Sequence, residues 1–229
     1  MAPESRARIL LAALARHANS DSVDWLGGAL PQPNKAFRRS QYFGAYAGAG
    51  RRFRQLDWHL EARDCEALRE VGLIDPARWS PDELARAALL LAASEALPAE
   101  EHAGVVEEAF RKGDSAERCA LLKSLALLPG SQRFLKTATE ASRAQVQEVF
   151  EAIACENAYP AMHFPELNFN QLVLKALFLE VPLARVHEWR PRCNPELGRM
   201  VSDYEAERVA ARRSVPTDIA DIRRTIGAL

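Results

Sequence analysis

The sequence SPDELARAALLLAASEALP, at residues 80–98, decides the fold class of this chain. Ser80 is a typical helix N-cap, Pro81 suits the first helical position, and Glu83 can complete a capping box. The residues expected on the buried face of this helix are Leu84, Ala88 and Leu91. Because Pro98 cannot continue a helix, the helix should end near it. This segment therefore contains a complete set of signals for an α-helix.

Two further helices are expected directly after this segment. The first covers about Ala99–Arg111, with Val106 and Phe110 buried, and Lys112-Gly113 ends it. The second begins at Asp114 and buries three leucines: Leu121, Leu125 and Leu128.

These helices contain an internal repeat. At an offset of 32 residues, the pattern Asp82, Arg86, Ala88-Leu89-Leu90 recurs as Asp114, Arg118, Ala120-Leu121-Leu122. The offset is close to the period of helical solenoids, in which each hairpin packs against the next. Chance similarity between two helices rich in alanine and leucine is the alternative. We expect an irregular α-solenoid of stacked helical hairpins, HEAT- or armadillo-like, with residues 80–153 its most repeat-like part.

The rest of the chain is also expected to be helical. Alanine and leucine dominate, strand-like runs are scarce, and the 48% hydrophobic content is typical of a globular chain. A helix predicted from Glu140 to Ile153 would continue the stack, with four residues inward: Val146, Val149, Phe150 and Ile153. No Gly/Ser linker divides the sequence. The sequence therefore predicts an all-α fold without a β-sheet, in a single helical domain over residues 1–229.

Charge and cysteine spacing argue against several classes of function. Thirty basic and thirty-one acidic residues give a net charge of -1, so the whole chain has no attraction for nucleic acid. The four cysteines form no C-x-x-C pair and the five histidines are dispersed, which predicts no metal site. The H-E-x-x-H, G-x-S-x-G and dinucleotide glycine motifs do not occur. We expect no cofactor, no catalytic residues and no nucleic-acid partner.

The N-terminus allows two interpretations. Arg6 and Arg8 precede the apolar run Ile9–Ala15, which could be a minimal signal peptide or an amphipathic first helix. We favour the helix, and no later segment approaches the about 18 apolar residues of a membrane span. A cytoplasmic location is therefore expected.

Residues 154–229 differ in composition from the part before them, since prolines become frequent. Tyr159-Pro160 and Phe164-Pro165 predict an extended, aromatic-rich loop, because a residue before proline avoids helical backbone. Asn168 should cap the helix that follows, with Gln171 completing a capping box. The amides expected to hold the loop backbone are Asn157 and Asn170.

Two more helices should complete this C-terminal part. Asn194-Pro195-Glu196 predicts the start of a helix that runs to about Arg213. Thr217-Asp218 predicts the start of a short last helix.

The helix expected after Pro165 is apolar on nearly all sides, which is typical of a buried central helix. Its apolar residues are Phe169, Leu172, Val173, Leu174, Ala176, Leu177, Phe178 and Leu179. A polar stripe nevertheless crosses it at Asn168, Gln171 and Lys175. A lysine on such a helix must reach solvent, pair with an acid or face a wet cavity. Its candidate acids are Glu156, Glu166 and Glu180.

A ligand pocket or partner surface is the functional alternative to this pairing. The residues that would form it are His163, Glu166, Asn168, Asn170, Gln171 and Lys175. A histidine beside prolines is more often a structural hydrogen-bonding residue, although it could also take part in proton transfer.

A second candidate site lies between residues 35 and 54. Six cations occur there without an acid among them: Lys35, Arg38, Arg39, Arg51, Arg52 and Arg54. Aromatic residues are interleaved: Phe37, Tyr42, Phe43, Tyr46 and Phe53. Such a mixture can bind phosphate, anionic lipid or single strands by charge and stacking. We expect a packed helix whose arginines reach solvent or the acids of residues 57–61. The alternative is that the five arginines contact an anion, a partner or a membrane.

Several C-terminal motifs resemble the EboA family. They are Cys155-Glu156-Asn157-Ala158-Tyr159-Pro160, Phe164-Pro165-Glu166-Leu167-Asn168-Phe169-Asn170-Gln171, Leu174-Lys175-Ala176-Leu177-Phe178, Val181-Pro182-Leu183 and Asn194-Pro195-Glu196-Leu197. The resemblance implies a bacterial protein of the ebo operon, which is associated with moving secondary-metabolite precursors between cytoplasm and periplasm. It implies no reaction and no catalytic residue.

Three hypotheses about function follow. The favoured one is a non-enzymatic helical binding or adaptor protein that binds a small metabolite or another protein of the ebo operon. The second is an enzyme acting on a small aromatic or isoprenoid-like metabolite in a pocket around His163, Glu166 and Lys175. The third is a peripheral adaptor at the inner membrane that attaches through residues 35–54.

Overall fold

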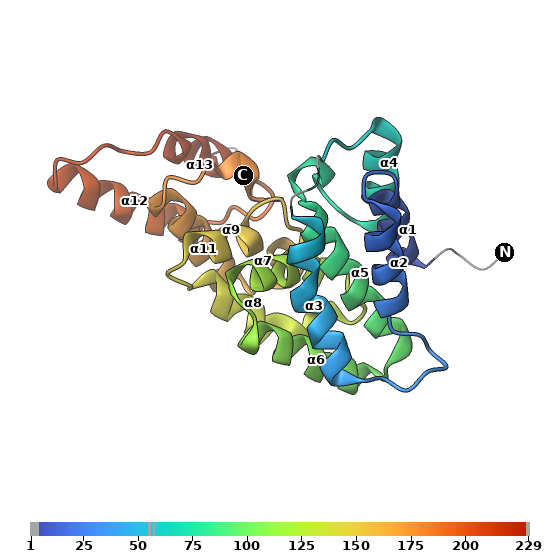
Figure 1. The fold of residues 1–229 in the computed structure, drawn as a ribbon. Coiled ribbons are helices and arrows are strands. Elements are labelled where there is room, and N and C mark those ends of the chain that lie inside the picture. The colour runs from blue at the N-terminus through green and yellow to red at the C-terminus, as the bar shows by residue number, and fades with distance from the viewer. Residues whose placement is uncertain (1–4, 55, 57, 228–229) are drawn as a thin grey trace. The chain divides into compact units, whose positions relative to one another are not determined.

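The computed structural model describes residues 5–54, 56 and 58–227 of the chain. These residues form thirteen α-helices, four short 3₁₀ helices and no strand, with one isolated bridge between Cys155 and Val186. The predicted all-α fold without a sheet is confirmed (Figure 1).

The helices have the following bounds in chain order: α1 Arg6–Ala15, α2 Ser20–Ala29, α3 Arg39–Phe53, α4 Ala62–Val71, α5 Pro81–Ala96, α6 Ala99–Lys112, α7 Ser115–Ser124, α8 Leu135–Ser142, α9 Gln147–Ala154, α10 Tyr159–His163, α11 Glu166–Phe178, α12 Pro195–Ala210 and α13 Asp218–Gly227. The 3₁₀ helices are Pro76–Arg78, Leu125–Leu127, Ser131–Phe134 and Leu183–Arg185.

The chain groups into two compact units, residues 1–137 and 138–229. The predictions of a single domain and of solenoid-like stacking stay predictions.

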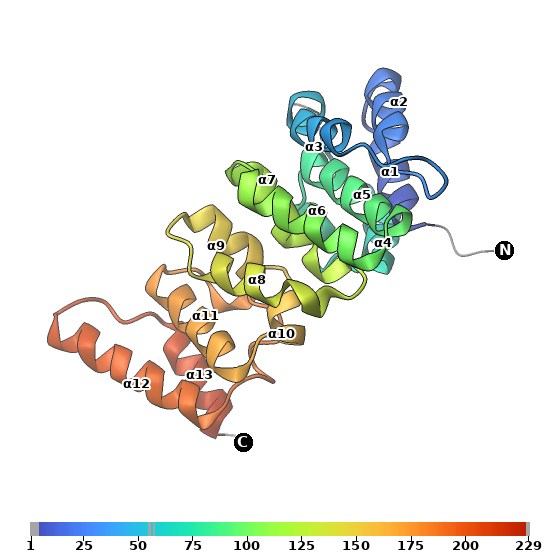
Figure 2. The ribbon, with the colours of Figure 1, turned by 90° about the horizontal axis from the view of Figure 1, so that it is seen from below.

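Helix α5 is the centre of the first unit. The predicted capping box is present: the Ser80 backbone N–H donates to Glu83 Oε2 at 2.9 Å, and the Glu83 N–H donates to Ser80 Oγ at 3.4 Å. Twelve of its sixteen residues are buried, so α5 is enclosed rather than amphipathic. Helices α1, α3 and α7 pack against it, and Figure 2 shows α5 between α1 and α7. The segment that predicts the fold class is thus the core of this unit.

The two helices after α5 have the predicted bounds to within one residue. Val106 is buried, whereas Phe110, also expected inward, is only half-buried. Helix α7 is capped by Asp114 and continues as a 3₁₀ turn. The three leucines expected inside are buried: Leu121, Leu125 and Leu128.

Two glycines let α3 approach its neighbours closely. A Cβ atom at Gly48 would lie 3.2 Å from the Trp25 ring of α2, and one at Gly50 would lie 3.0 Å from Arg86 of α5. Gly48 and Gly50 in the small-residue run of α3 are therefore explained by helix packing, which brings α2, α3 and α5 together.

The prediction of a single helix from Glu140 to Ile153 is wrong. Helix α8 ends at Ser142 and α9 begins at Gln147. Val146, expected inward, is the N-cap residue of α9 and is 48% exposed. Backbone carbonyls freed at this break accept hydrogen bonds from a lysine of α11, which compensates for the interrupted helix. The other residues expected inward are buried: Val149, Phe150 and Ile153.

Two prolines make helices α10 and α11 begin earlier in the sequence than predicted. The expected extended loop contains α10, because Pro160 lies in its first turn, where a missing N–H removes no helical bond. Phe164 is extended before Pro165, as predicted. Helix α11 begins at Glu166, so Asn168 lies inside its first turn and the prediction of an Asn168 cap is wrong.

Helix α11 is less completely buried than predicted. Phe178 is 60% exposed, and Leu174 and Leu179 are half-buried. The other predicted core residues are buried: Phe169, Leu172, Val173, Ala176 and Leu177. Figure 2 shows α11 between α9 and α12.

The last two helices begin where the sequence predicts. The Leu197 N–H donates to Asn194 Oδ1 at 2.9 Å, which is the expected N-cap of α12. That helix ends at Ala210, and α13 begins at Asp218. No helix among the described residues is long and apolar enough to cross a membrane.

Candidate functional site

Lys175, the polar residue that stands out on α11, is engaged by the fold. Its Nζ donates to the backbone oxygens of Ser142, at 3.0 Å, and Ala144, at 2.6 Å. The ammonium also lies 4.7 Å from the centre of the Phe150 ring. Burial lowers the Lys175 pKa, while the two carbonyl oxygens favour the charged form. Lys175 therefore closes the C-terminal end of α8, as a cation suits that end of a helix.

The three acids predicted as partners of Lys175 lie elsewhere, and that prediction is wrong. Glu156 accepts from Arg185 at 2.8 Å, and Glu180 is 3.5 Å from Arg208. Glu166 is exposed at the start of α11.

Of the histidine and amide candidates of α10 and α11, His163 and Asn170 contact other side chains of the fold. The His163 ring is half-buried 4.7 Å from the Tyr159 ring, and its burial lowers its pKa. Asn170 is fully buried and exchanges two amide hydrogen bonds with Asn194, at 3.0 and 2.9 Å. Gln171 is exposed. His163 and Asn170 thus contact different neighbours, and the predicted ligand or partner site in this segment stays a prediction.

Only one of the two amides expected to hold the loop does so. Asn157 donates to the Ala152 carbonyl and accepts from the Tyr159 N–H, each at 2.9 Å. Asn170 instead orients the residue that caps α12. Asn168 is half-buried in the first turn of α11.

The structure divides the basic segment between the two ends of α3. Lys35 and Arg38 lie before the helix and Arg39 opens it. The other three arginines follow after about 20 Å of helix: Arg51, Arg52 and Arg54. The five predicted arginines therefore do not form one surface cluster.

Three of these arginines are engaged by neighbouring side chains. Arg39 is paired with Glu108 at 2.6 Å, and Arg54 lies 3.6 Å from Asp82. Arg52 stacks 4.8 Å from the centre of the Trp25 ring. Among the described residues, the acids that contact this segment are Glu108 of α6 and Asp82 of α5. Of the acids expected at residues 57–61, residue 57 lies outside the described residues.

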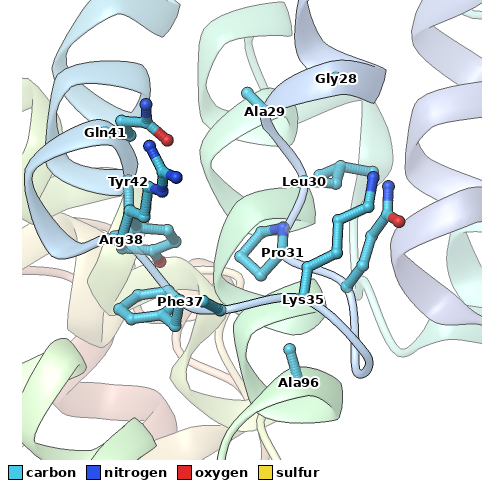
Figure 3. Close-up of a pocket in the computed structure, with 12 residues that line it drawn as sticks. Gly28, Ala29, Leu30, Pro31, Lys35, Phe37, Arg38, Gln41, Tyr42 and Ala96 are labelled. Atoms are coloured by element: carbon cyan, nitrogen blue, oxygen red, sulfur yellow. The ribbon is translucent and has the colours of Figure 1, made fainter.

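A pocket of about 130 Å³ lies at the N-terminal end of α3. We call it the α2–α3 pocket. It is lined by the end of α2, the connection to α3, the first turn of α3 and the end of α5: Gly28, Ala29, Leu30, Pro31, Gln32, Lys35, Ala36, Phe37, Arg38, Gln41, Tyr42 and Ala96. In Figure 3, Lys35 and Arg38 lie on opposite sides of Pro31.

The two cations that line this pocket are accessible to a ligand. Lys35 and Arg38 are exposed, and neither forms an ion pair with a carboxylate in the described part of the chain. The backbone N–H groups that open α3 add positive potential at the same place. The charge at this pocket is therefore positive, which is the sign that suits an anion.

Tyr42 lines the same pocket, and its hydroxyl is a hydrogen-bond donor that the described residues leave unused. Its hydroxyl is buried and has no hydrogen-bond partner among the described residues. Burial raises the pKa of Tyr42 far above its usual range, so the group stays protonated and can donate. An unpaired buried hydroxyl costs about 1–3 kcal/mol, and an oxygen of a ligand could recover this.

Sequence reasoning identified this site only in part. Arg38 was among the candidate anion contacts, whereas Tyr42 and Gln41 were not proposed as binding residues. The available signal was the run from Pro31 to Arg38, which contains two cations and no acid. The unpaired state of the Tyr42 hydroxyl leaves no trace in the sequence, because it depends on what packs around the ring.

No group of three or more His, Cys, Asp or Glu side chains in the described residues could hold a metal ion. No curated protein and no solved structure matches the chain. A family model described as metabolite traffic protein EboA matches residues 7–223. The chain therefore belongs to the EboA family, whose description gives it a role in metabolite traffic.

Proposed function

We propose that this EboA family member is a non-catalytic binding protein that takes up the anionic group of a metabolite in the α2–α3 pocket. The bound metabolite would then pass to another protein of the ebo operon, on the way from cytoplasm to periplasm. The observation that carries this proposal is a pocket lined by two exposed cations that form no ion pair among the described residues, with Tyr42, whose buried hydroxyl is unpaired, also in its wall.

Charge and hydrogen bonding would act together in such a site. Lys35 and Arg38 provide attraction from two sides, and the Tyr42 hydroxyl fixes one ligand oxygen. A binding role requires neither a nucleophile nor a proton-transfer group, and Lys175, which the enzyme hypothesis needs, already holds two carbonyl oxygens.

The proposal is tested by amide NMR titration of the full chain with inorganic phosphate and with acetate. We expect saturable shifts confined to the residues around the pocket. The double variant Lys35→Ser, Arg38→Ser should weaken binding at least about tenfold, since each charge-assisted hydrogen bond contributes more than 1 kcal/mol.

A matched control removes the same charge from the other end of the same helix. Arg51→Ser, Arg52→Ser should keep the phosphate affinity within about twofold, because those cations lie about 20 Å from the pocket. Equal weakening by both double variants, or no saturable shift with either anion, would contradict the proposal.

A further inference from the structure

We infer that the ligand is an amphiphile, with its anionic head group in the α2–α3 pocket and an apolar body in an adjoining cavity. This inference rests on the proposed function and names the class of ligand. It follows from the size of the pocket and from what lies beside it.

The α2–α3 pocket is too small for a whole metabolite. At about 130 Å³ it is smaller than sites for cofactors and drug-sized ligands, which have about 300–1,000 Å³. A phosphate or carboxylate fits it, and the rest of the ligand must lie outside.

A second cavity of about 370 Å³ shares the wall formed by Leu30, Pro31 and Gln32. Both cavities also border the C-terminal part of α5, the α2–α3 pocket at Ala96 and the second cavity at Ala92. Because these two alanines are one helical turn apart, the cavities are neighbours along α5. The connection between α2 and α3 thus lies against both.

The second cavity has a mixed lining, part of which suits an apolar group. Seven of its twelve lining residues are apolar and come from α1, α2, α5 and the connection: Ala7, Leu11, Gly27, Leu30, Pro31, Pro33 and Ala92. Its carboxylate, Glu95, already accepts a hydrogen bond from Ser5 Oγ at 2.6 Å. The remaining polar lining residues are Arg8, Gln32 and Asn34. An anionic head beside an alkyl or aromatic body matches the two cavities together.

A chain-length series tests the inference. The full-length protein is titrated with inorganic phosphate, then with n-butyl, n-hexyl and n-octyl phosphate below their micellar concentrations, and with the matching carboxylates. Affinity should rise about two- to fourfold per methylene until the second cavity is filled. Longer ligands should also shift the amide signals of Ala7 and Leu11, which phosphate alone should leave unchanged.

A variant that fills the second cavity separates its role from that of the pocket. A Cβ atom at Gly27 would be 3.9 Å from Leu11, so Gly27→Leu places a side chain in this cavity without a backbone clash. It should abolish the gain with chain length and retain phosphate binding. Gly104→Leu, on α6 and outside both cavities, should retain both.

The outcomes separate failure of the inference from failure of the proposed function. Phosphate binding with no gain from longer chains, or an unchanged gain in Gly27→Leu, overturns the inference and leaves the proposed function standing. Absence of binding by every anion overturns both. Alkyl binding that survives Lys35→Ser, Arg38→Ser overturns the placement of the head group.

A last comparison distinguishes a free amphiphile from a lipid surface, which presents the same chemistry. We expect no co-sedimentation with vesicles that contain an anionic phospholipid. Co-sedimentation that is lost in Lys35→Ser, Arg38→Ser would overturn the inference of a free molecule and assign the pocket to a membrane surface.

Discussion

The start of α3 and the body of α11 both place cations beside aromatic rings, but the fold uses them differently. Lys175 lies over Phe150 and holds two carbonyl oxygens at the end of α8. Lys35 and Arg38 lie beside Phe37 and Tyr42 with no carboxylate partner in the described part of the chain. A cation therefore indicates a binding site only if it does not already cap a helix end or pair with a buried acid.

The largest expected effect comes from making the same substitution in both regions. Lys175→Met should lower the free energy of unfolding by about 2–3 kcal/mol, because two carbonyl oxygens lose a charged donor. Lys35→Met should change it by less than about 0.5 kcal/mol, since its side chain is exposed. Urea denaturation measures the free energy of unfolding of both variants. Equal losses of stability would show that Lys35 is as important for the fold as Lys175.

The next effect concerns two amides of α11. Asn170→Ala should cost about 1–2 kcal/mol, because the buried Asn170 is the partner of the amide that caps α12. Gln171→Ala, one position along the helix but exposed, should be nearly neutral. Thermal and urea unfolding test this pair; a costly Gln171→Ala would show that the exposed face of α11 is structural too.

Two tyrosines one turn apart on α3 should respond with opposite signs. Tyr42→Phe should raise stability by up to about 1 kcal/mol, since it removes a buried hydroxyl without a partner. Tyr46→Phe should lower it by about 1 kcal/mol, because the Tyr46 hydroxyl donates to the Glu117 carbonyl at 2.9 Å. Only Tyr42→Phe should also weaken phosphate binding. A loss of stability in Tyr42→Phe would mean that its hydroxyl has a partner in solution.

The smallest effect is the pH dependence that each unit contributes. Burial lowers the pKa of His102 in the first unit and of His163 in the second. The folded state therefore takes up protons less readily than the unfolded state, and stability falls as the pH drops below the ordinary histidine value of about 6.5. His163→Gln should reduce the stability difference between pH 7 and pH 5 by less than about 1 kcal/mol, measured by urea unfolding at both values. An unchanged difference would assign the effect to other groups.

Local signals in the sequence predicted most helix starts. Ser80, Asp114 and Asn194 each form the expected cap, because a cap involves only residues three positions apart. The same logic failed at Asn168, where Pro165 starts α11 earlier. It also failed between α8 and α9, where a lysine 31 and 33 residues away stabilises the break.

The candidate site was predictable only as a region. The absence of acids between Lys35 and Arg54 indicated where an anion could bind. Which cations stay available depends on Glu108 and Asp82, which reach α3 from other helices. Pairings of this kind join residues far apart in the sequence, so periodicity and composition do not predict them.

Local propensity, capping residues and a long diagnostic motif are enough to predict the all-α class, most helix starts and the family from the sequence. Which polar groups are engaged and which have no partner depends on tertiary packing. Lys175 closes a helix end and the Tyr42 hydroxyl is left without a partner, since each outcome depends on the groups that packing brings within hydrogen-bond distance.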